Sequence, residues 1–216
     1  SGAIGGVVNV ITAKPEQGVQ TKLRVMGGSN DLEQYAITNE GSKKDWYWRV
    51  GVQKDIIGSY KDGHGVRIPQ HGNSHTASFM VGNTIDVKIA YDTYRGDVMY
   101  SDHLGALNHI RYGNEANDSL RAIWNNKISN RWSHQLYLMN NHYKTTYDGY
   151  LTDVKTRGIG DQITYKAKDH TVVGGFDWRQ DKVVNMGGVK LTNASYFIQD
   201  EWKFAPKWTV TPGIRV

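Results

Sequence analysis

Residues 46–53 read WYWRVGVQ, and their alternation decides the class of fold. Side chains of a β-strand point in turn to its two faces. One face of this segment therefore carries Trp46, Trp48, Val50 and Val52, and the other carries Tyr47, Arg49, Gly51 and Gln53. The segment is predicted to be a strand with one apolar face and one polar face.

The same alternation recurs along the chain, and no stretch of ordinary length has helical periodicity. The expected strands are 19–26, 31–39, 46–55, 76–81, 86–94, 119–126, 132–143, 156–166, 171–181, 193–204 and 208–216. In five of them, 46–55, 86–94, 132–143, 171–181 and 208–216, one face is mainly apolar and the other carries most of the Arg, Lys, Asp and Gln side chains. This division is typical of a wall with lipid on one side and water on the other.

The connections between these strands sort into two sets. Tight links are expected at 41–45, 82–85, 127–131, 167–170 and 205–207, and long polar ones at 56–75, 95–118, 144–155 and 182–192. The first connection, 27–30, is short as well. A meander whose two ends face different solvents sorts its connections in this way, whereas Greek-key crossovers would scatter them. A soluble up-and-down β-domain with uneven hairpins is the alternative.

The composition supports the membrane interpretation. Only 38% of the 216 residues are hydrophobic, against a usual ~45–50%, yet the chain holds 7 Trp and 13 Tyr. Five of the tryptophans lie close to tight links, as expected of an interfacial aromatic belt: Trp46, Trp124, Trp132, Trp202 and Trp208. We therefore expect an all-β fold, an antiparallel up-and-down transmembrane β-barrel, present as an incomplete barrel of about 11 strands.

Two further features of the composition exclude classes of function. The chain has no cysteine, which rules out disulfides and thiolate metal sites. Its net charge of +5 is spread among nearly as many carboxylates as cations, so no nucleic-acid partner is expected.

Two stretches carry a resemblance to a known family. Residues 1–15, SGAIGGVVNVITAKP, are rich in glycine, carry no charge before Lys14 and contain an apolar strand that something must cover. They closely resemble the end of the plug domain in TonB-dependent outer-membrane receptors. Residues 193–216, NASYFIQDEWKFAPKWTVTPGIRV, look like the strand, tight turn and strand unit of the same family.

The resemblance implies a domain organisation and a function. Residues 1–14 would be the C-terminal end of the plug, and 15–216 the N-terminal half of the barrel. The implied function is TonB-energised uptake of an iron chelate (siderophore), haem or cobalamin across the bacterial outer membrane. The implied partners are the TonB energising complex, a small-molecule metal chelate and outer-membrane lipid, with no cofactor and no enzymatic activity. A soluble or surface β-rich binding or adhesion protein that uses its Tyr-rich loops is the alternative.

Candidate site residues fall into two groups. The ligand-binding candidates lie in or beside the long connections: Tyr60, His64, Arg67, His71, Tyr100, Tyr112, Tyr147 and Tyr150. The cations expected to face the lumen are Arg24, Arg49, Lys88, Arg121 and Arg179. These cations could attract an anionic chelate or pair with plug carboxylates.

The sequence offers no catalytic or metal centre. His64, His71 and His75 fall within twelve residues of one another, but in a glycine-broken loop without a partner acid. A solvated polar loop is the expected interpretation, and haem or metal capture is the alternative. No enzyme is predicted.

Overall fold

The computed structural model describes residues 14–83, 87–101 and 110–216, and all the regular structure within them is β-strand. The long strands are β1 (Gly18–Gly28), β2 (Leu32–Lys43), β3 (Trp46–Ile57), β6 (Gln70–Asn83), β7 (Val87–Ser101), β8 (Ile110–Lys127), β9 (Trp132–Tyr147), β10 (Tyr150–Lys166), β11 (His170–Val183) and β12 (Val189–Ala205). The short ones are β4 (Tyr60–Lys61), β5 (Arg67–Ile68), β13 (Trp208–Val210) and β14 (Gly213–Arg215). Each expected strand overlaps at least one of these, so the all-β prediction is confirmed.

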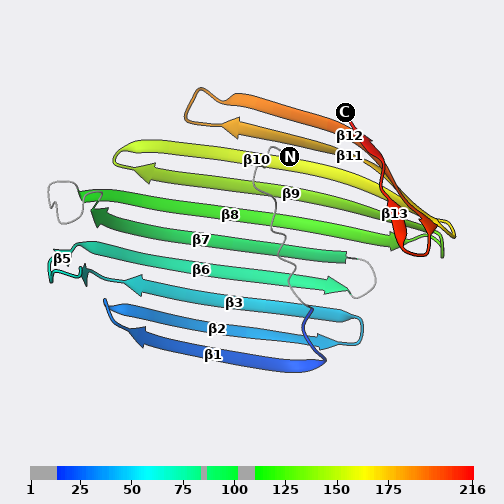
Figure 1. Ribbon diagram of the computed structural model, residues 1–216. Coiled ribbons are helices and arrows are strands. Elements are labelled where there is room, and N and C mark those ends of the chain that lie inside the picture. The colour runs from blue at the N-terminus through cyan, green and yellow to red at the C-terminus, as the bar shows by residue number, and fades with distance from the viewer. Residues whose placement is uncertain (1–13, 84–86, 102–109) are drawn as a thin grey trace.

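The strands form one antiparallel meander. The main sheet has 12 strands in the order β1-β2-β3-β6-β7-β8-β9-β10-β11-β12-β13, with β14 also beside β12, and β4 and β5 form a separate hairpin. Figure 1 shows the main sheet as a broad ribbon of neighbouring strands. Within the described residues β1 pairs only with β2, and β13 and β14 form the opposite edge, so the sheet is not closed. This is the incomplete barrel that the sequence predicts.

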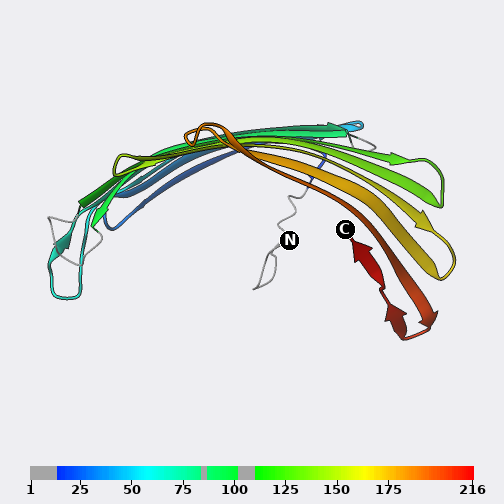
Figure 2. The ribbon, with the colours of Figure 1, turned by 90° about the horizontal axis from the view of Figure 1, so that it is seen from above.

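The sheet curves into an arc, which Figure 2 shows from above. Tyr47 points to the concave side, where the Nζ atom of Lys14, from the segment before β1, lies 5.7 Å from its ring centre. Side chains converge on a concave surface, and the buried non-glycine residues of the main sheet lie there: Glu40, Tyr47, Met80, Ala90 and Thr156, each no more than 9% exposed. The polar face of each strand is therefore the concave face.

Several long connections turn out shorter than the sequence predicts. The prediction of a long loop at 144–155 is wrong, because β9 and β10 extend through most of this segment. They are joined by a two-residue turn, Asp148-Gly149, with φ values of 46° and 84°. Both residues adopt the left-handed conformation of a tight hairpin turn, which glycine and aspartate tolerate best. The other long connections are shorter as well. The predicted connection 56–75 ends where β6 begins at Gln70, and the predicted connection 95–118 begins only after β7 ends at Ser101. Residues 184–188 alone separate β11 from β12, where 182–192 was predicted.

The error has a physical cause. Beyond the apolar part of each strand both faces meet water, so the alternation of apolar and polar residues ends while the backbone ladder continues. We refer to the end with the connections β2–β3, β8–β9, β10–β11 and β12–β13 as the tight-turn end, and to the opposite one as the far end. The strands extend past the apolar region at the far end.

The last expected strand, 208–216, is interrupted. It appears as β13 and β14, separated at Thr211 and Pro212. Proline has no N–H group for the ladder, and the register of β12 with β13 is already irregular between Trp202 and Ala205. The C-terminal edge consequently consists of two short pieces that both pair with β12.

Other expectations fall outside the structure. Residues 1–13 lie outside the described residues, so the buried strand and the plug assignment of 1–14 stay predictions. No helix long and apolar enough to cross a membrane occurs among the residues that the structure describes.

Candidate functional site

The concave face carries the charged side chains of the sheet. The strand registers put all the cations named from the sequence on this face: Arg24, Arg49, Lys88, Arg121 and Arg179. Arg49 is opposite Met80, Met80 is opposite Ala90, Ala90 is opposite Arg121, and the row continues through Met139 and Gly158 to Arg179. These cations therefore lie across one curved polar wall.

Glu40 organises the first part of this wall. Its carboxylate accepts hydrogen bonds from Lys22 Nζ and Arg49 Nε, each at 2.6 Å. The Glu40 side chain is only 11% exposed, whereas that of Lys22 is 58% exposed. Because a nearly buried carboxylate needs partners, the two cations stabilise its charged form and fix β1, β2 and β3 in register.

Further carboxylates neutralise other cations of the wall. Arg121 Nη2 lies 2.8 Å from Asp92 Oδ2, and Arg179 Nε lies 3.0 Å from Asp181 Oδ2. Asp177 accepts hydrogen bonds at 2.8 Å from both Tyr137 Oη and Arg215 Nη2. The sequence places Asp92 and Asp177 on the polar faces of their strands, but it did not predict which cations these carboxylates neutralise.

Two of the predicted cations differ from the rest. Among the described residues, no carboxylate lies within 4.0 Å of Arg24 or Lys88. Because the other three are paired within the sheet, the wall is a network of local ion pairs rather than a uniformly positive surface.

Aromatic rings on the concave face cover glycines of neighbouring strands. A Cβ atom on Gly82 would collide with the ring of Tyr47, and one on Gly160 with the ring of Tyr137. A Cβ atom on Gly175 would collide with the backbone oxygen of Asp161 and would lie 2.9 Å from the Cζ atom of Phe197. The glycines leave room for the rings to lie flat along the wall, as expected where a backbone must be approached closely.

The β4–β5 hairpin at the far end holds three of the ligand-binding candidates. Tyr60 is opposite Ile68, which is only 4% exposed. Arg67 Nε donates a hydrogen bond to Ser59 Oγ at 2.8 Å. His64 lies in the turn with its side chain 92% exposed and its backbone N–H bonded to Asp62 Oδ1 at 2.9 Å.

The tyrosine candidates separate onto two faces. Tyr147 and Tyr150 are opposite one another across the β9–β10 hairpin and lie on the concave side, with Tyr150 80% exposed. Tyr112 lies on the convex side, where its backbone N–H donates to Asp148 Oδ1 at 3.1 Å. Tyr100 lies in β7 opposite Gln70, and its side chain is outside the described part of the chain.

The histidines near β6 do not gather into one site. His71 and His75 both lie on the convex face of β6, and His71 Nε2 is 3.5 Å from Asp97 Oδ2. His64 lies apart in the β4–β5 hairpin. No group of three or more potential metal ligands occurs among the described residues.

The convex face carries a broad apolar band. Its side chains are large and open to the surroundings, for example Leu23, Val52, Phe79, Ile89, Leu120 and Leu138, all 40–75% exposed. Aromatic rings border the band at the tight-turn end. Trp132 packs on Tyr165 at 4.6 Å between ring centres, and Trp202 stacks on His170 at 5.6 Å and contacts Phe204 at 5.5 Å.

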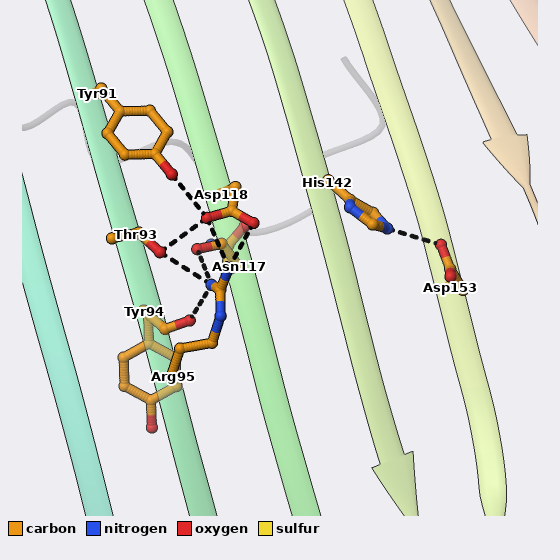
Figure 3. A network of polar contacts seen from close by, with 8 residues as sticks. All are labelled: Tyr91, Thr93, Tyr94, Arg95, Asn117, Asp118, His142 and Asp153. Carbon is orange, nitrogen blue, oxygen red and sulfur yellow. Dashed lines mark hydrogen bonds and ion pairs between the residues drawn. The ribbon is translucent and has the colours of Figure 1, made fainter.

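A polar network borders the band at the far end, and Figure 3 shows it. Arg95 Nη2 bonds both carboxylate oxygens of Asp118, at 2.8 and 3.0 Å, and Nη1 bonds Thr93 Oγ1 at 2.9 Å. Tyr91 Oη and Thr93 Oγ1 also donate to Asp118, at 3.0 and 2.7 Å. His142 Nε2 lies 2.9 Å from Asp153 Oδ1 on the same face. The convex face thus has an apolar centre between an aromatic and a polar border.

Comparison with solved structures identifies the fold. The chain is similar to the siderophore receptor PirA from Pseudomonas aeruginosa with a TM-score of 0.71 at 12% identity, covering 100% of this chain and 40% of that one. For the copper transporter OprC the TM-score is 0.69 at 16% identity, covering 94% and 38%. For the siderophore receptor PiuA from Acinetobacter baumannii it is 0.67 at 11% identity, covering 100% and 44%.

The chain thus shares the fold of part of these receptor and transporter structures, and the resemblance to TonB-dependent receptors is confirmed at the level of the fold. The chain spans less than half the length of each of these proteins. The solved structures are named as transporters and receptors, not as enzymes. No protein-family model matches the sequence, and no curated protein sequence matches it.

Proposed function

We propose that this chain forms part of the barrel of an outer-membrane receptor that imports a small metal chelate. The observation that carries the proposal is the division of the curved sheet into an ion-paired concave face and an apolar, aromatic-bordered convex face. Lipid covers such a convex face, and water or a ligand in transit covers such a concave face. The localisation is therefore the bacterial outer membrane.

The proposal includes a partner and a domain organisation. Residues 15–216 are the N-terminal half of the barrel, and residues 1–14 end a plug that fills its lumen. Energy for uptake comes from the TonB complex, because a plugged barrel needs an external source of work to open. The support is the sequence resemblance at residues 1–15 and 193–216 and the fold shared with siderophore receptors.

The ligand is an iron chelate (siderophore), haem or cobalamin, and we place its capture at the far end of the concave face. Tyr147 and Tyr150 supply flat aromatic faces and hydroxyl groups at the mouth, and the β4–β5 hairpin with Tyr60, His64 and Arg67 lies at the same end. Paired cations of the wall, such as Arg49 and Arg121, maintain a hydrated lumen rather than bind the ligand themselves.

The test uses the full-length protein purified in detergent and titrated with ferric siderophores, haem and cobalamin. We expect one of these ligands to bind, and the double variant Tyr147→Ala/Tyr150→Ala to weaken its affinity at least ~10-fold, the loss of a typical interface hot spot. Tyr112→Ala is the matched control, since Tyr112 lies at the same end on the convex face and should leave the affinity unchanged.

Two results would contradict the proposal. One is equal loss of affinity in the Tyr112→Ala control and the double variant, which would place binding outside the lumen. The other is a monodisperse protein that needs no detergent, because the alternative of a soluble or surface-attached adhesive protein predicts solubility in water.

A further inference from the structure

A row of basic side chains crosses the convex face at the far end. Lys54 of β3 is opposite His75 of β6, His75 is opposite Arg95 of β7, and Arg95 is opposite Ala116 of β8. Ala116 is in turn opposite Lys144 of β9, so four basic side chains lie in one line across five strands. Neighbouring strands are ~4.8 Å apart, so the row spans ~19 Å.

The charges of this row are incompletely balanced by the protein. Arg95 is paired with Asp118, and Lys144 is directly opposite Asp153 of β10, whose carboxylate contacts His142. Among the residues that the structure describes, no carboxylate lies within 4.0 Å of Lys54, His75 or Lys144, and the side chains of all three are exposed. The row therefore favours an anion from outside the chain.

Two adjoining depressions lie along the row. A polar one of about 420 Å³ is lined by the basic residues His75, Arg95 and Lys144 and by two carboxylates, Glu115 and Asp97, the latter of which faces His71. A second one of about 540 Å³ is predominantly apolar, lined among others by Leu23, Ile37, Val52 and Ala77. His75 and Arg95 line both, so the polar and apolar parts form one amphipathic groove.

The position along the strand fits the border of a membrane. Trp46, at the aromatic tight-turn end, and Lys54 are eight residues apart on the same face of β3. At ~3.4 Å per residue and a strand tilt of ~40°, this is ~21 Å of height, close to the ~25 Å apolar band of a transmembrane barrel. Lys54 thus lies where lipid headgroups begin, and the apolar half of the groove lies at the level of acyl chains.

We propose that this groove binds a lipid with an anionic phosphate headgroup in the outer leaflet. The phosphate lies at His75 and Arg95, which line both depressions, with Lys54 on one side of it and Lys144 on the other, and an acyl chain lies on Leu23, Ile37, Val52 and Ala77. The groove is on the convex face, so it does not depend on the plug or on the rest of the barrel. The inference rests on the proposed membrane location but not on the identity of the imported ligand.

The test is native mass spectrometry of the full-length protein in micelles that contain equal amounts of phosphatidylglycerol and phosphatidylcholine. We expect the wild type to retain phosphatidylglycerol in preference to phosphatidylcholine. A basic residue at an anionic membrane surface contributes about fivefold in affinity, so Lys54→Gln/Lys144→Gln should lower this retention ~25-fold. Both side chains are exposed, and their removal leaves the Arg95–Asp118 pair in place.

Lys190→Gln is the matched control. Lys190 is also an exposed convex-face lysine at the far end, opposite Lys182, but it lines neither depression. It should retain the anionic lipid within about twofold of the wild type. Equal retention of the two lipids by the wild type, or an equal loss in the control and the double variant, would overturn the lipid site while leaving the receptor proposal intact. A protein that fails to insert into bilayers would overturn both.

Discussion

Leu120 and Ser119 are neighbours on β8 that the proposed function assigns to opposite environments. Leu120 lies on the convex face, 44% exposed, opposite Tyr91, and Ser119 lies on the concave face opposite Asp92. Leu120 lies four residues from Trp124 on the same face, toward the far end of β8. At ~3.4 Å per residue and a ~40° strand tilt, this is ~10 Å along the membrane normal. Since the apolar band is ~25 Å tall, Leu120 lies close to its middle.

Lysine at the two positions should therefore have very different effects. A lysine on the lipid face near the midplane costs ~2–4 kcal/mol, so Leu120→Lys should reduce the folding equilibrium constant in bilayers ~30- to ~1000-fold. Ser119→Lys keeps its charge in lumen water beside Asp92 and should change the free energy of unfolding by less than ~0.5 kcal/mol.

The assay is a urea titration of the full-length protein in phospholipid vesicles, followed by tryptophan fluorescence and by the gel mobility of unheated samples. A neutral Leu120→Lys together with a strongly destabilising Ser119→Lys would refute the reasoning. That outcome would mean that the apolar convex face is exposed to water and that the concave face is closed.

Three other changes test the concave wall and its turns by the same titration. Gly160→Ala places a methyl group against the ring of Tyr137 and should destabilise the fold by ~1–3 kcal/mol. Gly174→Ala is its control and should be tolerated, because the new Cβ atom would lie 3.7 Å or more from its neighbours. Glu40→Gln leaves two cations without their shared charge and should cost ~1–3 kcal/mol. Glu201→Gln is the control: Glu201 is exposed and its carboxylate lies 3.5 Å from Lys203 Nζ, so its substitution should destabilise the fold by less than ~1 kcal/mol. Gly149→Ala places a side chain at a φ of 84° and should cost ~1 kcal/mol; no change would argue against the tight β9–β10 turn.

The sequence predicted the strands well wherever one face is apolar. Trp46–Val52 and Trp132–Leu138 alternate clearly, and both β3 and β9 begin at the predicted tryptophan. It failed at the far end, where segments such as 144–155 are polar on both faces. Backbone hydrogen bonds continue there without any change in hydrophobicity to mark them, so the strands were longer than predicted.

The candidate site was predictable only in part. Period-two spacing alone put Arg49, Arg121 and Arg179 on the polar face, because side-chain direction in a strand is a local property. Their partners Glu40, Asp92 and Asp181 depend on side-chain geometry and register between strands, which spacing within one strand cannot supply. Tyr112 and Tyr147 looked equivalent as aromatic residues beside long connections, and the strand registers separate them onto opposite faces.

The sequence by itself determined the strand rhythm, the apolar and polar faces and the aromatic border, because these follow from side-chain alternation within each strand. Only the tertiary structure decided which way the sheet curves, which carboxylate neutralises which cation, and that Lys54, His75, Arg95 and Lys144 form one row. Such contacts join residues on different strands, and their geometry depends on register and curvature, which no single segment encodes.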